Sequence, residues 1–243
     1  MKIAILGAES TGKSQLAAAL ANALRSQGKT VFLVDEYLRE WCSVHGRTPR
    51  ADEQALIAHE QVRRVEAAMA MAVPAGTSTS TPTVDPINIA IVISDTTALM
   101  TAVYSELLFN DASLHDFAAA HQRSYDLTLV TGLDLPWVAD GVQRDGPHTR
   151  EAADSLLRAA LGRAALGRAP LGYQVVYGTG AARLANALNA TCATQLIAFC
   201  ADGTRARVLF PSENPEKKAI WAWPCDKCSD PDCEHRLFSR LLL

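Results

Sequence analysis

A glycine-flanked turn near the start of the chain constrains the fold more than any other segment. Residues Gly7–Ser14 read Gly-Ala-Glu-Ser-Thr-Gly-Lys-Ser, which matches a phosphate-binding loop at every fixed position. An apolar run, Lys2–Leu6, precedes the turn, and a helix-forming run, Gln15–Leu24, follows it. A strand, a loop and a helix in this order direct successive backbone N–H groups and the helix N-terminus at one anion.

The residue types in this loop suit contact with ATP. Gly7 and Gly12 permit the tight turn because glycine lacks a Cβ atom. Lys13 is expected to reach the β- and γ-phosphates, and Ser14 to place its hydroxyl on Mg²⁺. The predicted nucleotide contacts are Gly7, Ala8, Glu9, Ser10, Thr11, Gly12, Lys13, Ser14 and Gln15.

Apolar runs alternate with helical patterns along the rest of the chain. Further strands are predicted at Lys29–Val34, Ile87–Ile93, Asp126–Val130 and Tyr173–Tyr177. Helices are predicted at Asp52–Ala72, Thr97–Phe109 and Ser113–Arg123, and from about Thr149 and Ala181. In the first of these helices, the side predicted to be apolar carries Leu56, Val62, Val65 and Met69. Strands that alternate with helices predict a doubly wound α/β fold, a parallel sheet covered on both faces.

Composition divides the chain into a main domain and a small appendage. With 49% hydrophobic residues, the 243-residue chain can bury one substantial core, and residues 1–200 are predicted to form a nucleotide-binding domain. A low-complexity polar stretch marks an insertion at about 74–84, and a glycine-containing polar loop marks a lid at about 133–147. Residues 201–243 are charged and contain proline, which indicates a separate C-terminal appendage.

Charge and hydropathy exclude several classes of partner. The net charge of −3 disfavours tight, sequence-independent binding to nucleic acid. Glu9 and Lys13 interrupt the N-terminal apolar stretch too early for a secretion signal. No segment approaches the roughly 18 apolar residues of a membrane span. We therefore expect a soluble, cytoplasmic protein with no membrane partner.

Acidic residues follow two predicted strands, where parallel sheets bind ligands. Asp95 is expected either to hold Mg²⁺, directly or through water, or to cap the following helix. Asp35 and Glu36 follow the second strand, and one of them is the candidate base that takes a proton from an acceptor hydroxyl. The alternative for this pair is a solvated acidic turn paired with Arg39.

A polar loop, Trp137–Gly146, follows the fourth predicted strand. A loop that closes over a nucleotide excludes water and brings an arginine onto the developing phosphoryl charge. Arg144 is the candidate for this role, and the alternative is a surface position beside Asp145.

Three cysteines and a histidine crowd the end of the chain: Cys225, Cys228, Cys233 and His235. Three thiolates and one imidazole form a complete tetrahedral set for Zn²⁺. Because such a set leaves no open position, we expect a structural zinc ion that folds the appendage. The alternatives are a redox pair or a surface cluster.

Several segments together resemble the ribosylnicotinamide kinase domain of NadR-type NAD-salvage proteins, an AAA/ATPase-like group with the phosphate loop. The likeness runs in order from about Met1 to Ala190. It rests on Glu9-Ser-Thr11, Glu36-Tyr-x-Arg-Glu40, Ser94-Asp-Thr96, Tyr125-Asp126 and Trp137…Asp140-Gly141…Arg144. Ala139 stands where an acid is common in these proteins, and the insertion and the cysteine appendage are additional.

This resemblance implies a kinase with a lid that phosphorylates nicotinamide riboside with Mg-ATP. Lys13 and Ser14 would bind phosphate and Mg²⁺, Asp95 would assist the metal, and Arg144 would belong to the lid. The implied acceptor contacts are Glu36, Tyr37, Arg39 and Asp95.

Two hypotheses therefore remain open from the sequence. The first is a small-molecule kinase, with nicotinamide riboside as the leading acceptor. The second is a nucleotide-dependent switch or adaptor that hydrolyses ATP and presents a protein partner with its zinc-stabilised appendage. The acidic pair Asp35-Glu36 at a strand end favours the kinase.

Overall fold

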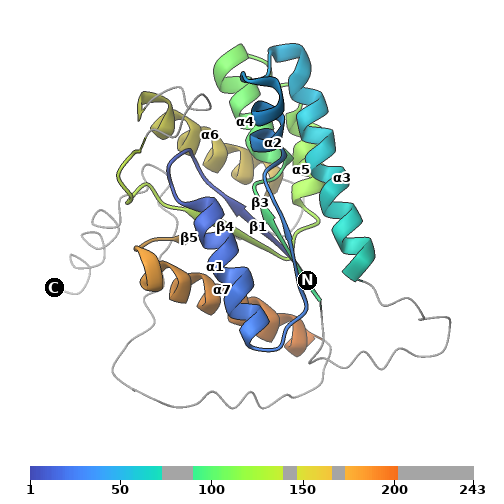
Figure 1. Cartoon of the computed structure of the whole chain (residues 1–243), viewed down its shortest axis with the longest axis vertical. Helices are drawn as coiled ribbons and strands as arrows, with labels where there is room; N and C mark the ends of the chain where they lie inside the picture. The colour runs from blue at the N-terminus through green and yellow to red at the C-terminus, as the bar shows by residue number, and fades with distance from the viewer. Residues whose placement is uncertain (73–89, 139–146, 166–172, 202–243) are drawn as a thin grey trace.

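The chain forms a three-layer α/β structure (Figure 1). The computed structural model describes residues 1–72, 90–138, 147–165 and 173–201. The strands are β1 (Lys2–Leu6), β2 (Val31–Val34), β3 (Ile91–Asp95), β4 (Leu127–Thr131) and β5 (Tyr173–Val176). The helices are α1 (Lys13–Ser26), α2 (Tyr37–His45), the 3₁₀ turn η1 (Ala51–Glu53), α3 (Gln54–Ala72), α4 (Ala98–Phe109), α5 (His115–Gln122), α6 (Pro147–Ala165) and α7 (Gly180–Ala201).

The five strands form one parallel sheet in the order β2-β3-β1-β4-β5. β1 is central, and its residue Ile5 lies beside Asp95 of β3 and beside Leu129 of β4. All five residues of β1 are buried, as expected for a strand covered on both faces. The carboxyl ends of all five strands meet at one edge of the sheet, so the loops that follow them share this edge.

Helices cover both faces of the sheet (Figure 1). On one face, Ile3 and Ile5 pack with apolar residues of α1 and α7. On the other face, Ala4 and Leu6 pack in a cluster with residues of α3, α4, α5 and α6. The alternation of side chains along β1 therefore divides the core into two layers, and the predicted doubly wound α/β class is confirmed.

Helix α2 was not predicted, since only the acidic residues Asp35 and Glu36 were assigned after the second strand. Only Asp35 and Glu36 separate β2 from α2. The helix forms because Trp41 and Cys42 lie on one side of it and bury themselves against Ile57 of α3. The short amphipathic pattern from Tyr37 onward thus marks a helix, while Glu36, just before it, forms the ion pair with Arg39 that the alternative of an acidic turn expected.

The predicted apolar side of α3 was partly wrong. Leu56 is 55% exposed, whereas Ile57 and Gln61 are 1% and 2% exposed. A buried glutamine explains the shift, since the Gln61 amide accepts from the Tyr37 backbone N–H at 2.8 Å and donates to the Asp35 carbonyl oxygen at 3.3 Å. Val65 is buried as predicted.

Two predicted features of the domain organisation lie outside the described residues. These are the insertion at about 74–84 and all of the appendage after residue 201. Within the described ranges, none of the helices combines the length and the apolar character that a membrane crossing requires.

The corrected orientation of α3 predicts different costs for two neighbouring truncations. Ile57→Ala should lower the free energy of unfolding by about 2–5 kcal/mol, because it leaves a cavity in the core. Leu56→Ala should change it by less than about 0.5 kcal/mol, because the side chain is largely solvated. Urea unfolding of both variants measures the difference. Equal losses would contradict the orientation seen in the structure.

Candidate nucleotide-binding and acceptor site

The phosphate-binding loop, Gly7–Ser14, connects the central strand β1 to α1. Its backbone enters the left-handed region at Ser10 (φ 59°) and Gly12 (φ 76°), and Gly7 has a φ of 146°. A Cβ atom on Gly7 would lie 2.1 Å from the Thr131 hydroxyl oxygen. Glycine is therefore required at position 7 both by conformation and by the close approach of β4.

Neighbouring elements hold the loop in place. The Thr11 hydroxyl donates to the Ala8 carbonyl oxygen at 2.7 Å, and the Thr131 hydroxyl lies 2.6 Å from that of Thr11. Arg183 of α7 donates to the Thr11 carbonyl oxygen and pairs with Asp134. The loop is thus tied to β4, to the segment after it and to α7, and it presents a preformed cradle for an anion.

The loop lysine is buried inside this cradle. Lys13 Nζ donates to the Ala8 carbonyl oxygen at 2.8 Å. Burial lowers the pKa of Lys13, while the carboxylates of Glu36, Asp95 and Glu9 raise it. Burial outweighs these carboxylates, so the pKa of Lys13 stays below its usual value, and an anionic ligand in the loop would favour the charged amine.

Two oxygen atoms beside the loop lack partners. Asp95 is 4% exposed, and its Oδ1 has no hydrogen-bond partner within the described part of the chain. The Ser14 hydroxyl oxygen is buried and also lacks a partner there. Burial raises the pKa of Asp95, and the Ser14 hydroxyl lies near enough to lower it, although the two groups do not have the geometry of a hydrogen bond. A carboxylate and a hydroxyl are oxygen ligands of the kind that Mg²⁺ prefers, so these residues fit the predicted magnesium site.

The alternative role of Asp95 as a helix cap is wrong. The Thr97 side chain caps α4, because its hydroxyl accepts from the Leu99 backbone N–H at 3.2 Å.

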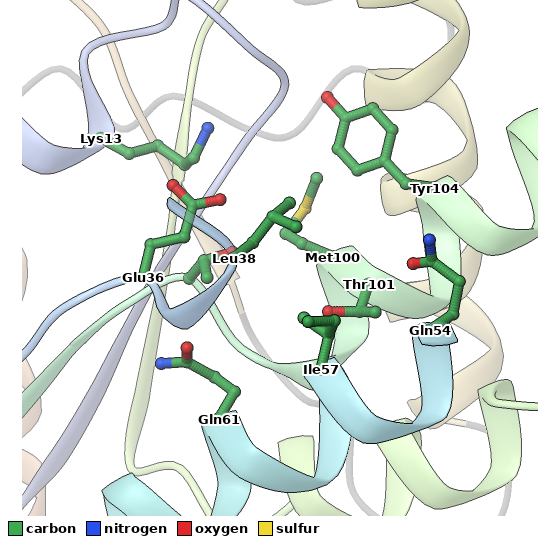
Figure 2. Close-up of a pocket in the computed structure, with 10 residues that line it drawn as sticks. Lys13, Glu36, Leu38, Gln54, Ile57, Gln61, Met100, Thr101 and Tyr104 are labelled. Carbon is green, nitrogen blue, oxygen red and sulfur yellow. The ribbon is translucent and has the colours of Figure 1, made fainter. Parts of the chain in front are cut away.

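A cavity of about 40 Å³ opens beside the loop (Figure 2). The side chains lining it come from α1, from the loop before α2, and from α2, α3 and α4, and they include Lys13, Glu36, Leu38, Gln54, Gln61, Met100, Thr101 and Tyr104. Figure 2 shows the Glu36 carboxylate pointing toward the Lys13 side chain, whose amine is turned away from it. The cavity therefore joins the phosphate loop to a carboxylate at the end of β2.

The structure separates the predicted acceptor residues. Glu36 lines the cavity and pairs with Arg39 at 2.7 Å. Asp35 is exposed and is not among the lining residues. Tyr37 lies against the Arg64 guanidinium, 4.4 Å from its ring centroid, and lines a separate surface hollow with Leu56 and Arg63. Of the acidic pair, only Glu36 is placed beside the loop lysine.

The remaining predicted nucleotide contacts lie along the loop and the start of α1. Ala8 is fully buried, Gln15 is exposed, and the Ser10 hydroxyl accepts from the Val138 backbone N–H at 2.7 Å. Glu9 accepts a hydrogen bond from the Tyr104 hydroxyl at 2.6 Å and another from the Thr149 hydroxyl. Glu9 thus connects the loop to α4 and α6.

Sequence reasoning missed the polar residues that α3 and α4 contribute to the cavity. Gln54 and Gln61 are buried, and Tyr104 both lines the cavity and bonds to Glu9. Glutamines in a helical pattern are usually assigned to the solvent-exposed face of the helix. The only sequence signal for their burial was the pair of apolar residues between them on α3, Ile57 and Ala58.

Two predicted groups lie outside the described residues: the lid arginine Arg144, and the zinc ligands Cys225, Cys228, Cys233 and His235. Among the residues that the structure does describe, there is no cluster of three metal-ligating side chains. The lid and the zinc site therefore stay predictions.

The close approach at Gly7 predicts a strong effect of one methyl group. Gly7→Ala should abolish ATP binding and lower the free energy of unfolding by about 1–3 kcal/mol, because Thr131 and the loop must move apart. Gly162→Ala is the matched control, since its Cβ would meet nothing within 4 Å and alanine favours a helix by about 0.5–1 kcal/mol. Calorimetry with ATP and thermal unfolding measure both. Undiminished ATP binding by Gly7→Ala would contradict the described loop geometry.

Comparison with solved structures supports the fold. A NadR protein in complex with NR superposes with a TM-score of 0.57 at 19% identity, covering 86% of this chain and 54% of that one. A NadR protein in complex with NAD and AMP-PNP superposes with a TM-score of 0.56 at 18% identity, covering 86% of this chain and 51% of that one. The chain spans about half the length of these NadR chains, and at this identity the likeness shows the fold.

Comparison with sequences identifies the family. No curated protein matches the chain. The family model described as AAA domain, however, matches residues 2–183. This match includes the whole phosphate-binding loop, the strand that ends at Asp95 and the cavity beside Lys13. The chain therefore belongs to this AAA domain family.

Proposed function

We propose that this protein is an ATP-dependent small-molecule kinase whose acceptor is nicotinamide riboside. The observation that carries the proposal is the shared cavity that Lys13 of the phosphate loop and Glu36 both line. A kinase needs a phosphate cradle and a carboxylate that orients the acceptor hydroxyl within reach of each other. A loop that only hydrolyses ATP as a switch does not need a separate cavity with such a carboxylate.

The nucleotide would bind along Gly7–Ser14, with Lys13 on its terminal phosphates. Ser14 and Asp95, whose buried oxygen atoms lack partners in the described chain, would hold Mg²⁺. When bound, Mg²⁺ neutralises charge that develops on the phosphates. The NadR structure with AMP-PNP supports the choice of ATP.

Glu36 would act as the base. The acceptor hydroxyl oxygen forms a bond to the γ-phosphorus as the bond from that phosphorus to the bridging oxygen breaks, and ADP leaves. The hydroxyl proton passes to Glu36. Arg39, paired with Glu36 at 2.7 Å, would orient the carboxylate.

The acceptor would enter the cavity between α2, α3 and α4. At about 40 Å³, the cavity is narrower than typical small-molecule sites of roughly 300 Å³ or more. Leu38 and Met100 line it, and methionine adapts readily to a ligand's shape. The amides of Gln54 and Gln61 would supply hydrogen bonds to a carboxamide-bearing nucleoside, and the NadR structure with NR supports nicotinamide riboside in particular.

The proposal predicts acceptor-dependent turnover. Purified protein with Mg-ATP and nicotinamide riboside should form nicotinamide mononucleotide and ADP, measured by chromatography. Lys13→Ala should lower kcat at least about 100-fold, because it removes charge stabilisation at the phosphates. Glu36→Gln should lower kcat about 10²–10⁴-fold, because it removes the base.

Asp35→Asn is the matched control, since Asp35 is the exposed neighbour, and it should retain turnover. ATP hydrolysis that nicotinamide riboside does not stimulate would instead favour a nucleotide switch. Full activity in Lys13→Ala would reject the kinase assignment.

We also propose a structural zinc ion in the appendage, held by Cys225, Cys228, Cys233 and His235. Elemental analysis of the purified chain should find one zinc per molecule. Cys228→Ser should release it, because a tetrahedral site loses most of its affinity with one ligand. Cys192→Ser, at a free cysteine of α7, should retain it. Zinc-free wild-type protein purified without chelators would rule out the site.

A further inference from the structure

The first turn of α6 brings a buried arginine beside the phosphate loop. Thr149 donates a hydrogen bond to the Glu9 carboxylate, which joins the start of α6 to the middle of the loop. Arg150 follows directly and is 7% exposed. The side chain is therefore enclosed at the junction between α6 and Gly7–Ser14.

Two of the three nitrogen atoms of the Arg150 guanidinium lack partners among the described residues. Its Nε and Nη2 atoms are buried, and neither has a hydrogen-bond partner within the described structure. Other buried arginines nearby differ: Arg183 donates to the Gly178 and Thr11 carbonyl oxygens, and Arg158 pairs with Asp154 at 2.9 Å. A buried cation with unmet donors is costly, and an anion bound at this position would relieve that cost.

The surroundings of Arg150 specify an anion. Burial lowers the pKa of Arg150, the carboxylates of Asp134 and Glu9 raise it, and the charge of Arg183 lowers it. Both carboxylates are occupied by other donors, since Asp134 pairs with Arg183 and Glu9 accepts from Tyr104 and Thr149. The guanidinium fork matches a phosphate group, with which it forms two parallel hydrogen bonds.

The position of Glu9 indicates which phosphate this is. Glu9 is bonded on one side to Thr149, next to Arg150, and on the other to Tyr104, which lines the acceptor cavity. A phosphate group bound by Arg150 would thus lie on the side of the loop that faces the acceptor cavity. In ATP, the phosphate nearest the acceptor is the γ-phosphate.

We infer that Arg150 binds the γ-phosphate of ATP from the side of α6 and stabilises charge on the phosphoryl group during transfer. This inference rests on the proposed nucleotide site.

The test compares nucleotides with and without the γ-phosphate on the full chain. Arg150→Met removes the charge and keeps most of the packing. Calorimetry should show that its Kd for AMP-PNP rises at least about tenfold, whereas its Kd for ADP changes less than about twofold, because only AMP-PNP carries the lost contact. The Tm of the ligand-free variant should be unchanged or higher, since an unpartnered buried charge is gone.

Arg158→Met is the matched control on the same helix. It breaks a buried ion pair, so its ligand-free Tm should fall while AMP-PNP binding to the folded protein stays at the wild-type level. Arg150→Lys gives a second reading if Arg150→Met does not fold, and it should also weaken AMP-PNP selectively, because lysine lacks the fork.

Equal AMP-PNP affinity in wild type and the Arg150 variants would overturn the inference and leave the proposed kinase intact. A fall in Tm with equal weakening of AMP-PNP and ADP would also overturn it, since that pattern marks a structural role. Wild-type protein that binds neither nucleotide would overturn the proposed function, and the inference with it.

Discussion

The parallel pairing of β1 with β3 and β4 determines where the polar groups of the site lie. Because Ile5 is in register with Asp95 and Leu129, the loop that leaves β1 emerges between the end of β3 and the end of β4. Asp95 is thereby placed beside Ser14 of the loop, and Thr131 closes against Gly7 from the other side. The two apolar layers on either face hold this edge rigid, so the site inherits its geometry from the sheet.

Several buried charged groups gather at this edge of the sheet. Lys13 is buried within the loop, and, within the part of the chain that the structure describes, Arg150 has unmet donors and Asp95 an unmet acceptor. Each of these groups is costly in isolation, because burial penalises its charged form. Together they have the composition of a site for a magnesium–triphosphate complex: cations for the phosphate oxygens, and a carboxylate and a hydroxyl for the metal. These buried charges lower the free energy of unfolding of the ligand-free protein. A bound nucleotide would satisfy them, and this would add to its binding free energy.

The sequence predicted the sheet, the phosphate loop and the acidic strand ends, because each depends on local patterns: apolar runs, glycine spacing and strand-then-helix order. The buried face of α3 could not be predicted in the same way. Gln61 is buried because backbone groups of Asp35 and Tyr37, distant in sequence, satisfy its amide, and no periodicity encodes that. The choice between Asp35 and Glu36 likewise needed α2, which begins immediately after them and places only Glu36 beside Lys13. Arg150 was not singled out at all, since an arginine on a helix is ordinarily solvated and only its burial distinguishes it.

The central claim is that one edge of the sheet holds the nucleotide and the acceptor side by side. Its most direct test is a crystal structure of the full chain with AMP-PNP, Mg²⁺ and nicotinamide riboside. The account predicts the γ-phosphate against Lys13 and the riboside hydroxyl between that phosphate and the Glu36 carboxylate. A riboside bound elsewhere, such as the surface hollow beside Tyr37, or a nucleotide away from Gly7–Ser14, would contradict it.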